Sequence, residues 1–196
     1  MRKKLPSLKI ITDKTNGLIT MDLVERVGEN RKYKIKNNFT GILAKSDVKK
    51  FEKICKLLNK ELPAPVKDEV VVGMVESGVV MACMLAKVRN TRFTYSTKRE
   101  YRSDTTPIKI LEKRVNNRVH HFYDLNPKDK VIIIEDEVSK GDGLCLAWET
   151  FRTHGIEVLA LCSIIETLNY HARENIKKRT GLNLVSLVEI ELNFDF

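Results

Sequence analysis

Residues 131–143, with the sequence VIIIEDEVSKGDG, place two acids and a glycine-containing loop directly after an apolar run. Ionised Glu135 and Asp136 are hydrogen-bond acceptors, so each can accept a hydroxyl proton of a vicinal diol. The loop after them consists of Ser139, Lys140, Gly141, Asp142 and Gly143. Its successive N–H groups can surround a terminal phosphate, because glycine permits the turn and the close approach of the backbone. The pattern indicates a site for a phosphorylated sugar, although a buried strand followed by an acidic turn would give the same residues.

The elements on either side of these acids are predicted by their apolar patterns. Four consecutive β-branched residues, 131–134, are typical of a strand buried on both faces, as central parallel strands are. After Gly143, a helix is predicted in which apolar residues at 144, 147, 148 and 151 share a face until Gly155 ends it. The acids then lie at the carboxyl end of a strand and the loop at a helix N-terminus, where open α/β sheets bind ligands and phosphate.

The same order of elements recurs along the chain. Ser46 and Asp47 predict the N-cap of an amphipathic helix that ends before Pro63. Further strands are predicted at 69–75, 91–96, 157–165 and 184–192, and further helices at 79–89 and 170–179. Alternating strands and helices predict an α/β fold with a mostly parallel sheet and helices on both faces.

Two regions lack this order. Residues 1–45 mix short β-like pieces with turn formers, which predicts a small irregular N-terminal cap or hood. Residues 97–118 carry seven Lys or Arg and little apolar periodicity, which predicts a mobile or ligand-dependent loop before a short strand at 119–123. We therefore expect one domain, 1–196, made of a cap at 1–45 and an α/β core at 46–196.

Composition narrows the class of protein but not its ligand. The chain has 196 residues, 42% hydrophobic and 31% charged, and contains no apolar run close to the ~20 residues of a membrane-spanning helix. No apolar segment typical of a signal peptide follows the basic start, so a cytoplasmic location is expected. The net charge of +9 favours anionic partners, including nucleotides and nucleic acid, without choosing among them.

A few single residues carry their own expectations. The four cysteines have no metal-ligand spacing and are expected to be reduced core residues. His120 and His121 occupy alternate faces of a short strand, so one should point to the core or a cleft and the other to solvent. Trp148 is expected in the core.

The 131–143 segment resembles the thirteen-residue signature of the type I phosphoribosyltransferases, which has four hydrophobic residues, two acids and a loop of small residues. The resemblance implies that the ligand is 5-phosphoribosyl 1-pyrophosphate. Glu135 and Asp136 would then bind the ribose hydroxyls, and residues 139–143 would surround the 5′-phosphate.

The resemblance extends over roughly residues 66–166. The segment VVGMVESGVVMACMLA, 71–86, is similar to the pyrophosphate loop of the family, with Glu76, Ser77 and Gly78 at the turn. Together with the stretches 95–100 and 119–123, it most resembles the phosphoribosyltransferase-like proteins of tellurite-resistance-type operons.

The resemblance also implies a reaction. Ribose would be transferred to a nucleobase-like nitrogen heterocycle, with Mg²⁺ held by substrate oxygens and reached by the carboxylates through water. Three cations of the basic loop, Lys98, Arg99 and Arg102, are candidates to close over the departing pyrophosphate. Like members of this family, the chain is expected to form a homodimer.

The loop departs from the family pattern in three ways. Lys140 and Gly143 stand where many members have hydroxyl side chains, and Asp142 brings a carboxylate close to an expected dianion. That carboxylate must therefore point outward or meet a cation or metal. Ser139 stands where members specific for 6-oxopurines carry an aspartate, so the sequence leaves the acceptor open.

Two functions follow from these features. The first is a phosphoribosyltransferase, which is favoured because no DNA-reading module is recognisable. The alternative is a regulator that senses phosphoribosyl pyrophosphate and binds nucleic acid without turnover, since fold alone does not fix function.

Overall fold

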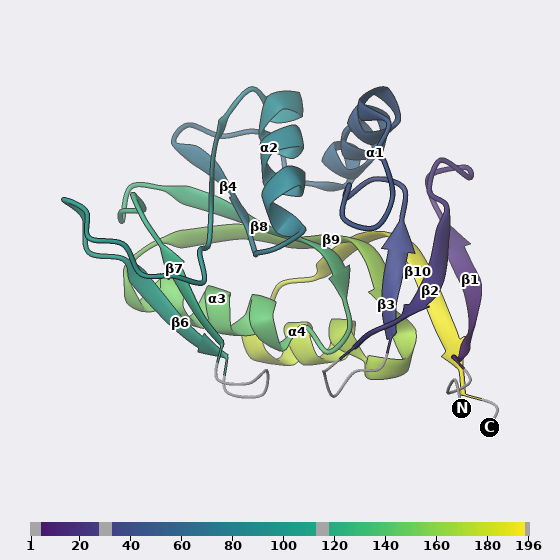
Figure 1. Cartoon of the computed structure of the whole chain (residues 1–196). Coiled ribbons are helices and arrows are strands. Elements are labelled where there is room, and N and C mark those ends of the chain that lie inside the picture. Colours follow the sequence, from purple (N-terminus) through teal and green to yellow (C-terminus); the bar gives the residue numbers. More distant parts are fainter. Residues whose placement is uncertain (1–4, 28–32, 113–117, 195–196) are drawn as a thin grey trace.

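The computed structural model describes residues 5–27, 33–112 and 118–194 (Figure 1). Its centre is a six-stranded sheet in the order β1-β10-β9-β8-β4-β5. The strands of this sheet are β1 (Ser7–Asp13), β4 (Glu69–Gly73), β5 (Arg92–Tyr95), β8 (Lys130–Val138), β9 (Glu157–Thr167) and β10 (Leu184–Asn193). All neighbouring strands are parallel except β1 and β10, which confirms the mostly parallel sheet.

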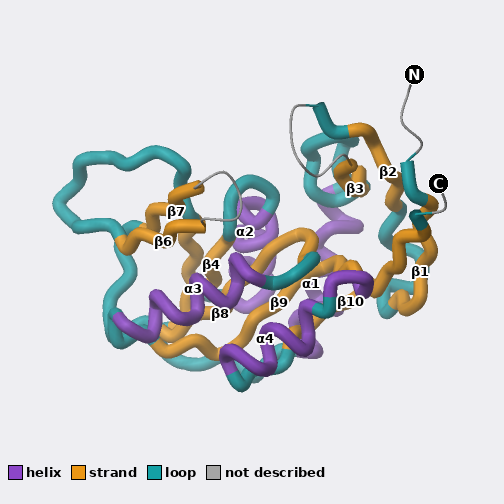
Figure 2. The backbone as a smooth tube through the Cα atoms, turned by 90° about the horizontal axis from the view of Figure 1, so that it is seen from below, coloured by secondary structure: helices purple, strands orange, loops and turns teal. Residues whose placement is uncertain are grey.

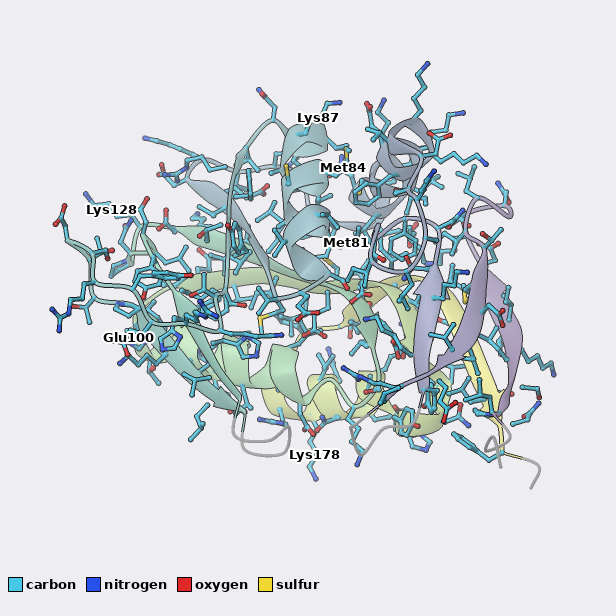
Figure 3. The ribbon with its side chains drawn as sticks, viewed as in Figure 1. Met81, Met84, Lys87, Glu100, Lys128 and Lys178 are labelled. Atoms are coloured by element: carbon cyan, nitrogen blue, oxygen red, sulfur yellow. The ribbon has the colours of Figure 1, made fainter. Side chains whose placement is uncertain are left out.

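Helices cover both faces of the sheet, as predicted (Figure 1). Helices α1 (Val48–Glu61) and α2 (Gly78–Arg89) lie on one face, and α3 (Asp142–Thr153) and α4 (Ala172–Thr180) lie on the other. Figure 2 shows α3 and α4 side by side, with a short 3-10 helix, η1 (Leu168–Tyr170), leading into α4. In Figure 3, Met81 lies at the end of α2 nearest the sheet and Lys87 at the far end.

Strand β8 divides the core into two apolar clusters. Ile132 and Ile134 pack in the cluster with α1 and α2, while Val131 and Ile133 pack in the cluster with α3 and α4. All four side chains are fully buried, which confirms a central strand covered on both faces. The strand continues to Val138, so the acids belong to its last residues rather than to the turn after it.

Helix α1 begins and ends where the sequence indicates. The Asp47 carboxylate accepts from the N–H groups of Lys49 and Lys50, and the helix ends before Pro63. Phe51 and Leu58 are buried on the face toward the sheet, whereas Val48 in the first turn is mostly exposed.

Two segments predicted to be irregular contain regular structure. Strand β1 pairs with β10, so the first strand belongs to the main sheet, and the cap is the separate hairpin of β2 (Met21–Glu25) and β3 (Tyr33–Asn37). Within 97–118, β6 (Ile108–Glu112) pairs with β7 (Arg118–Phe122) in a second hairpin; residues 113–117 of the predicted loop lie outside the described residues. The two hairpins stand at opposite ends of the molecule (Figures 1 and 2).

The cysteines, the histidine pair and Trp148 differ in part from what the sequence predicts. Cys83 is exposed on α2, so the prediction that all four cysteines lie in the core was wrong for this residue. His120 and His121 are both buried, although one was expected at the surface. Trp148 is partly buried against the core, with the Arg152 guanidinium 4.8 Å from its ring centroid. Among the described residues, no helix is both long and apolar enough to cross a membrane.

Candidate functional site

The carboxylates of the predicted site lie among the last residues of the central strand β8. Glu135, Asp136 and Glu137 are each partly buried at the carboxyl end of β8. Because successive side chains of a strand point to opposite faces, Asp136 leaves β8 on the face of Ile134, toward α2. Burial raises the pKa of Asp136 above its ordinary value, and the negative charge of Glu137 adds to this effect.

The second predicted loop follows β4, the strand next to β8. Strand β4 ends at Gly73, and the N–H group of Met74 then donates to the carbonyl oxygen of Ile134 at 3.2 Å. The peptide bond between Val75 and Glu76 is cis. This loop is therefore hydrogen-bonded directly to the strand that carries the acids.

Two glycines allow α2 to begin against the sheet. A Cβ atom on Gly73 would lie 2.3 Å from the Gly78 carbonyl oxygen, and a Cβ on Gly78 would lie 2.8 Å from the Ile134 carbonyl oxygen. Both distances are shorter than any normal contact, so larger residues would separate the loop from β8. Gly78 thus has a packing role in addition to its predicted place in the pyrophosphate loop.

The side chains of Ser77 and Asp136 connect the two predicted parts of the site. The Ser77 hydroxyl is buried, and its interaction with the Asp136 carboxylate lowers the pKa of Asp136 against the effect of burial. Lys34, on β3 of the cap, is close enough that its charge also lowers this pKa. The structure therefore brings together the loop at 76–78, the acids at 135–136 and one residue of the cap.

The glycine loop leads from β8 into α3. Gly141 has φ of 72°, in the left-handed region that glycine tolerates, and α3 begins at Asp142. Gly143, predicted as part of the loop, therefore lies in the first turn of the helix. The first N–H groups of a helix have no partner within it, so this position still offers a donor to an anion. Ser139 is partly buried and Lys140 is exposed.

The carboxylate of Asp142 meets a cation, as the sequence required. Its Oδ1 atom accepts from Arg179 Nη1 of α4 at 3.1 Å and from Asn175 Nδ2 at 3.3 Å. The same Asn175 group donates to the carbonyl oxygen of Lys140 at 2.7 Å. Helix α4, which the sequence analysis did not connect with the site, thus contacts the glycine loop.

The three candidate cations differ in their position. Lys98 forms an ion pair with Glu76, which places it beside the predicted pyrophosphate loop. Arg99 and Arg102 are exposed farther along the segment that leads to β6. The structure therefore brings Lys98 to the site and leaves Arg99 and Arg102 as candidates for closure only.

The start of this basic segment is attached to the β6–β7 hairpin. Thr97 and His121 exchange two backbone hydrogen bonds of 2.9 Å. Ser96 Oγ accepts from the N–H group of Val75 at 3.0 Å and lies 3.1 Å from His120 Nδ1. Glu100, labelled in Figure 3, forms an ion pair with Lys109 of β6.

Lys34, Ser96 and Asn175 were missed by the sequence analysis. The alternation in β3, where Tyr33 and Ile35 are buried, is a signal that could have placed Lys34 on a polar face. No comparable signal marks Ser96 or Asn175, because their partners are distant in sequence.

The residues of this site fit a magnesium ion that is shared with a substrate. Within the described parts of the chain, no group of three or more His, Cys, Asp or Glu could hold a metal ion. Glu135 and Asp136 supply the oxygen donors that Mg²⁺ prefers, and this ion commonly combines one or two carboxylates with water and phosphate oxygens.

Comparison with known proteins identifies the fold. No family model matches the chain. It is 22% identical over 126 residues to a hypoxanthine/guanine phosphoribosyltransferase of Methanobrevibacter ruminantium, a match that covers 64% of this chain and 66%, just under two thirds, of that protein. The crystal structure of adenine phosphoribosyltransferase from Rhodothermus marinus superimposes with a TM-score of 0.68 at 16% identity, covering 86% of this chain and 93% of that one.

A second solved structure adds ligands to the comparison. Adenine phosphoribosyltransferase from Trypanosoma brucei, in complex with AMP, pyrophosphate and ribose-5-phosphate, gives a TM-score of 0.67 at 13% identity, covering 86% of this chain and 76% of that one. At these identities the comparisons establish the fold, which is the one shared by these enzymes.

Proposed function

We propose that this chain, whose fold is that of the type I phosphoribosyltransferases, transfers 5-phosphoribose from phosphoribosyl pyrophosphate to a purine base and releases pyrophosphate. The observation that carries this proposal is the direct contact between a pyrophosphate-type loop and the strand of the acids: the Met74 N–H group donates to the Ile134 carbonyl oxygen at 3.2 Å, and the Ser77 hydroxyl lowers the pKa of Asp136. A purine acceptor is supported by the names of the similar proteins, which act on hypoxanthine and guanine or on adenine.

Each part of the substrate has a matching group of donors or acceptors. Glu135 and Asp136 would accept hydrogen bonds from the ribose hydroxyls. Residues 139–143 would surround the 5′-phosphate with N–H groups at the start of α3, where the helix dipole favours negative charge. The turn at 76–78 would hold the pyrophosphate, opposite the ribose acids.

The site also explains how the reacting bond could be weakened. Cleavage of the anomeric C–O bond moves negative charge onto pyrophosphate and positive charge onto the ribose ring, so cations near the pyrophosphate stabilise the transition state. Lys98 is already paired with Glu76 at the loop, and we infer that it exchanges this carboxylate for pyrophosphate oxygens when substrate binds. Arg99 and Arg102 would add charge if their segment closes over the site.

Magnesium belongs to this proposal as a partner of the substrate. Glu135 and Asp136 would hold the ion through water and ribose oxygens. Bound there, Mg²⁺ would neutralise charge on the pyrophosphate and stabilise the ionised form of Asp136, whose pKa burial raises.

The proposed function also includes a narrower family relation and an oligomeric state. The stretches 95–100 and 119–123 support a relation to the phosphoribosyltransferase-like proteins of tellurite-resistance-type operons. A homodimer is expected from the family resemblance, and sedimentation equilibrium of the pure protein would measure it.

The direct test is release of pyrophosphate from phosphoribosyl pyrophosphate and Mg²⁺ in the presence of adenine, hypoxanthine or guanine. We expect turnover with at least one base. The Glu135→Gln/Asp136→Asn double variant should lose binding of phosphoribosyl pyrophosphate in calorimetry while remaining folded by circular dichroism. Lys128→Ala is a surface control and should bind normally, since Lys128 is exposed just before β8 begins, at the opposite end of this strand from the acids (Figure 3).

The same assays address the alternative function. A regulator would bind phosphoribosyl pyrophosphate without turnover, and its net charge of +9 would support salt-dependent binding of nucleic acid. Absence of turnover with all three bases, together with such nucleic-acid binding, would contradict the enzyme proposal. Unchanged affinity in the double variant would contradict the assignment of the acids.

A further inference from the structure

We propose that Arg179 and Asn175 of α4 are positioning residues that make the glycine loop able to bind a phosphate despite the carboxylate at Asp142. This inference rests on the proposed function, because it assumes that residues 139–143 receive a phosphate. It concerns a helix that lies outside the segment resembling the family signature.

The loop needs such a partner because of its own charge. Asp142 occupies the first turn of α3, where a phosphate would approach the free N–H groups. The negative charges of the Asp142 carboxylate and of the phosphate repel each other, and a partly buried setting screens this repulsion less than bulk water does. A neutralising group is therefore required if Asp142 is to remain ionised beside a dianion.

Arg179 is placed to neutralise it. Its Nη1 donates to Asp142 Oδ1 at 3.1 Å, while Nε and Nη2 donate to Glu149 Oε1 at 3.0 and 2.8 Å. Asp142 and Glu149 are seven residues apart on α3, so they lie on the same face of that helix. The guanidinium thus bridges two turns of α3 and holds the Asp142 carboxylate toward α4 rather than toward the mouth of the loop.

Asn175 fixes the backbone of the loop. Its amide group has two N–H donors, and they reach the Lys140 carbonyl oxygen at 2.7 Å and Asp142 Oδ1 at 3.3 Å. A carbonyl oxygen that is held by Asn175 cannot turn toward a bound phosphate. The fully buried Ile176 completes the contact, because it packs directly beneath Gly141.

The packing of α4 against α3 keeps Asn175 and Arg179 in contact with the glycine loop. Helices α3 and α4 run side by side on the same face of the sheet (Figure 2). Asn175 and Arg179 are four residues apart and so lie on one face of α4, whereas Lys178 is exposed and points away from the sheet (Figure 3). Lys178 therefore offers a control with the same change of charge on the same helix.

The test uses ribose 5-phosphate as the probe and calorimetry as the measurement. We expect Arg179→Met to weaken its binding about tenfold, because Asp142 then loses its ion pair with Arg179, and Lys178→Met to leave it within about twofold. The rescue variant Arg179→Met/Asp142→Asn should recover most of the affinity, because the repelling charge is gone. Asn175→Ala should weaken binding about threefold to tenfold, and adding Asp142→Asn should not restore the affinity of this variant.

Several outcomes would overturn the inference. Equal losses in Arg179→Met and Lys178→Met would show only an effect of net charge, and a double variant as weak as Arg179→Met would show only loss of packing. If Arg179→Met does not fold, Arg179→Lys keeps the charge and should bind better than Asn175→Ala; the reverse order would contradict the proposal.

The result is separable from the proposed function. If the wild-type protein binds ribose 5-phosphate with the expected variant pattern but releases no pyrophosphate with any base, the positioning role stands and the enzyme proposal fails. If the wild-type protein does not bind ribose 5-phosphate, the positioning role fails, whether or not pyrophosphate is released.

Discussion

Replacement of Gly141 by alanine tests how tightly the glycine loop is built against α4. Gly141 has φ of 72°, and a non-glycine residue in this region costs about 1–2 kcal/mol. Part of this cost is offset, by about 0.4–1 kcal/mol, because alanine also reduces the freedom of the unfolded chain. Strain of the backbone alone should therefore lower the free energy of unfolding by roughly 1 kcal/mol.

The new Cβ atom adds a steric cost. It would lie 2.8 Å from Ile176 Cδ1 and 2.9 Å from Cγ1, and Ile176 is fully buried and cannot move into solvent. Overpacking of this kind costs about 1–3 kcal/mol, so the total loss should be about 2–4 kcal/mol. The Gly181→Ala variant is the matched control, because Gly181 has φ of 74° and nothing within 4 Å of its Cβ position.

Urea denaturation of both variants separates the two costs. Gly181→Ala should lose about 1 kcal/mol, and Gly141→Ala should lose 1–3 kcal/mol more. In an Ile176→Ala background, the further change Gly141→Ala should cost no more than Gly181→Ala does, because the clash is removed. Equal losses in the two single variants would refute the argument that the loop is packed against Ile176. Gly141→Ala should also weaken binding of ribose 5-phosphate.

Three further changes test the rest of the site and its scaffold. Burial raises the pKa of Asp136 above 3.8, so the native state holds this proton more tightly than the unfolded state does. The free energy of unfolding therefore falls as pH rises from about 3.8 through the raised native pKa. Urea denaturation across pH should show Asp136→Asn to be more stable than the wild type at pH 7, with the difference vanishing toward pH 3. Ser96→Ala leaves the N–H group of Val75 without its acceptor and should raise the KM for phosphoribosyl pyrophosphate about tenfold with a smaller effect on kcat; an unchanged KM would exclude a role in positioning the loop. Glu69→Gln breaks a fully buried ion pair with Arg89, far from the acids of the site. Urea denaturation should show a loss of about 3–5 kcal/mol in the free energy of unfolding, while the folded fraction should keep its affinity for substrate.

The central part of the fold could be predicted because its local pattern and its burial agree. The apolar residues 131–134 are fully buried on both faces, and the acids after them lie near the end of the same strand. The first turn of α1 was also predictable, because the Asp47 carboxylate satisfies N–H groups only two and three residues away. Such features depend on contacts between near neighbours in sequence.

The missed features depend on distant partners. Strand β1 is mostly exposed and lacks a clean alternation, and its place in the sheet comes from pairing with β10 at the other end of the chain. In β6, Ile108 and Ile110 are buried with Lys109 exposed between them, but this alternation is short and lies among basic residues that dominate the pattern. Asn175 contacts the loop only because α3 and α4 pack together, which the sequence does not state.

Three partly or fully buried acids differ in how their negative charge is compensated, and this difference supports the assignment of the site. Glu69 is paired with the Arg89 guanidinium through two oxygens, and Asp142 is paired with Arg179. For Asp136, burial and the adjacent acid Glu137 raise the pKa, while the charge of Lys34, the Ser77 hydroxyl and its own backbone N–H group lower it. Asparagine at this position would avoid the cost of an ionised group, so the carboxylate is not explained by stability. A poorly compensated acid at the end of a central strand is explained if its charge is balanced by a ligand, as the ribose hydroxyls and Mg²⁺ of the proposed substrate would do.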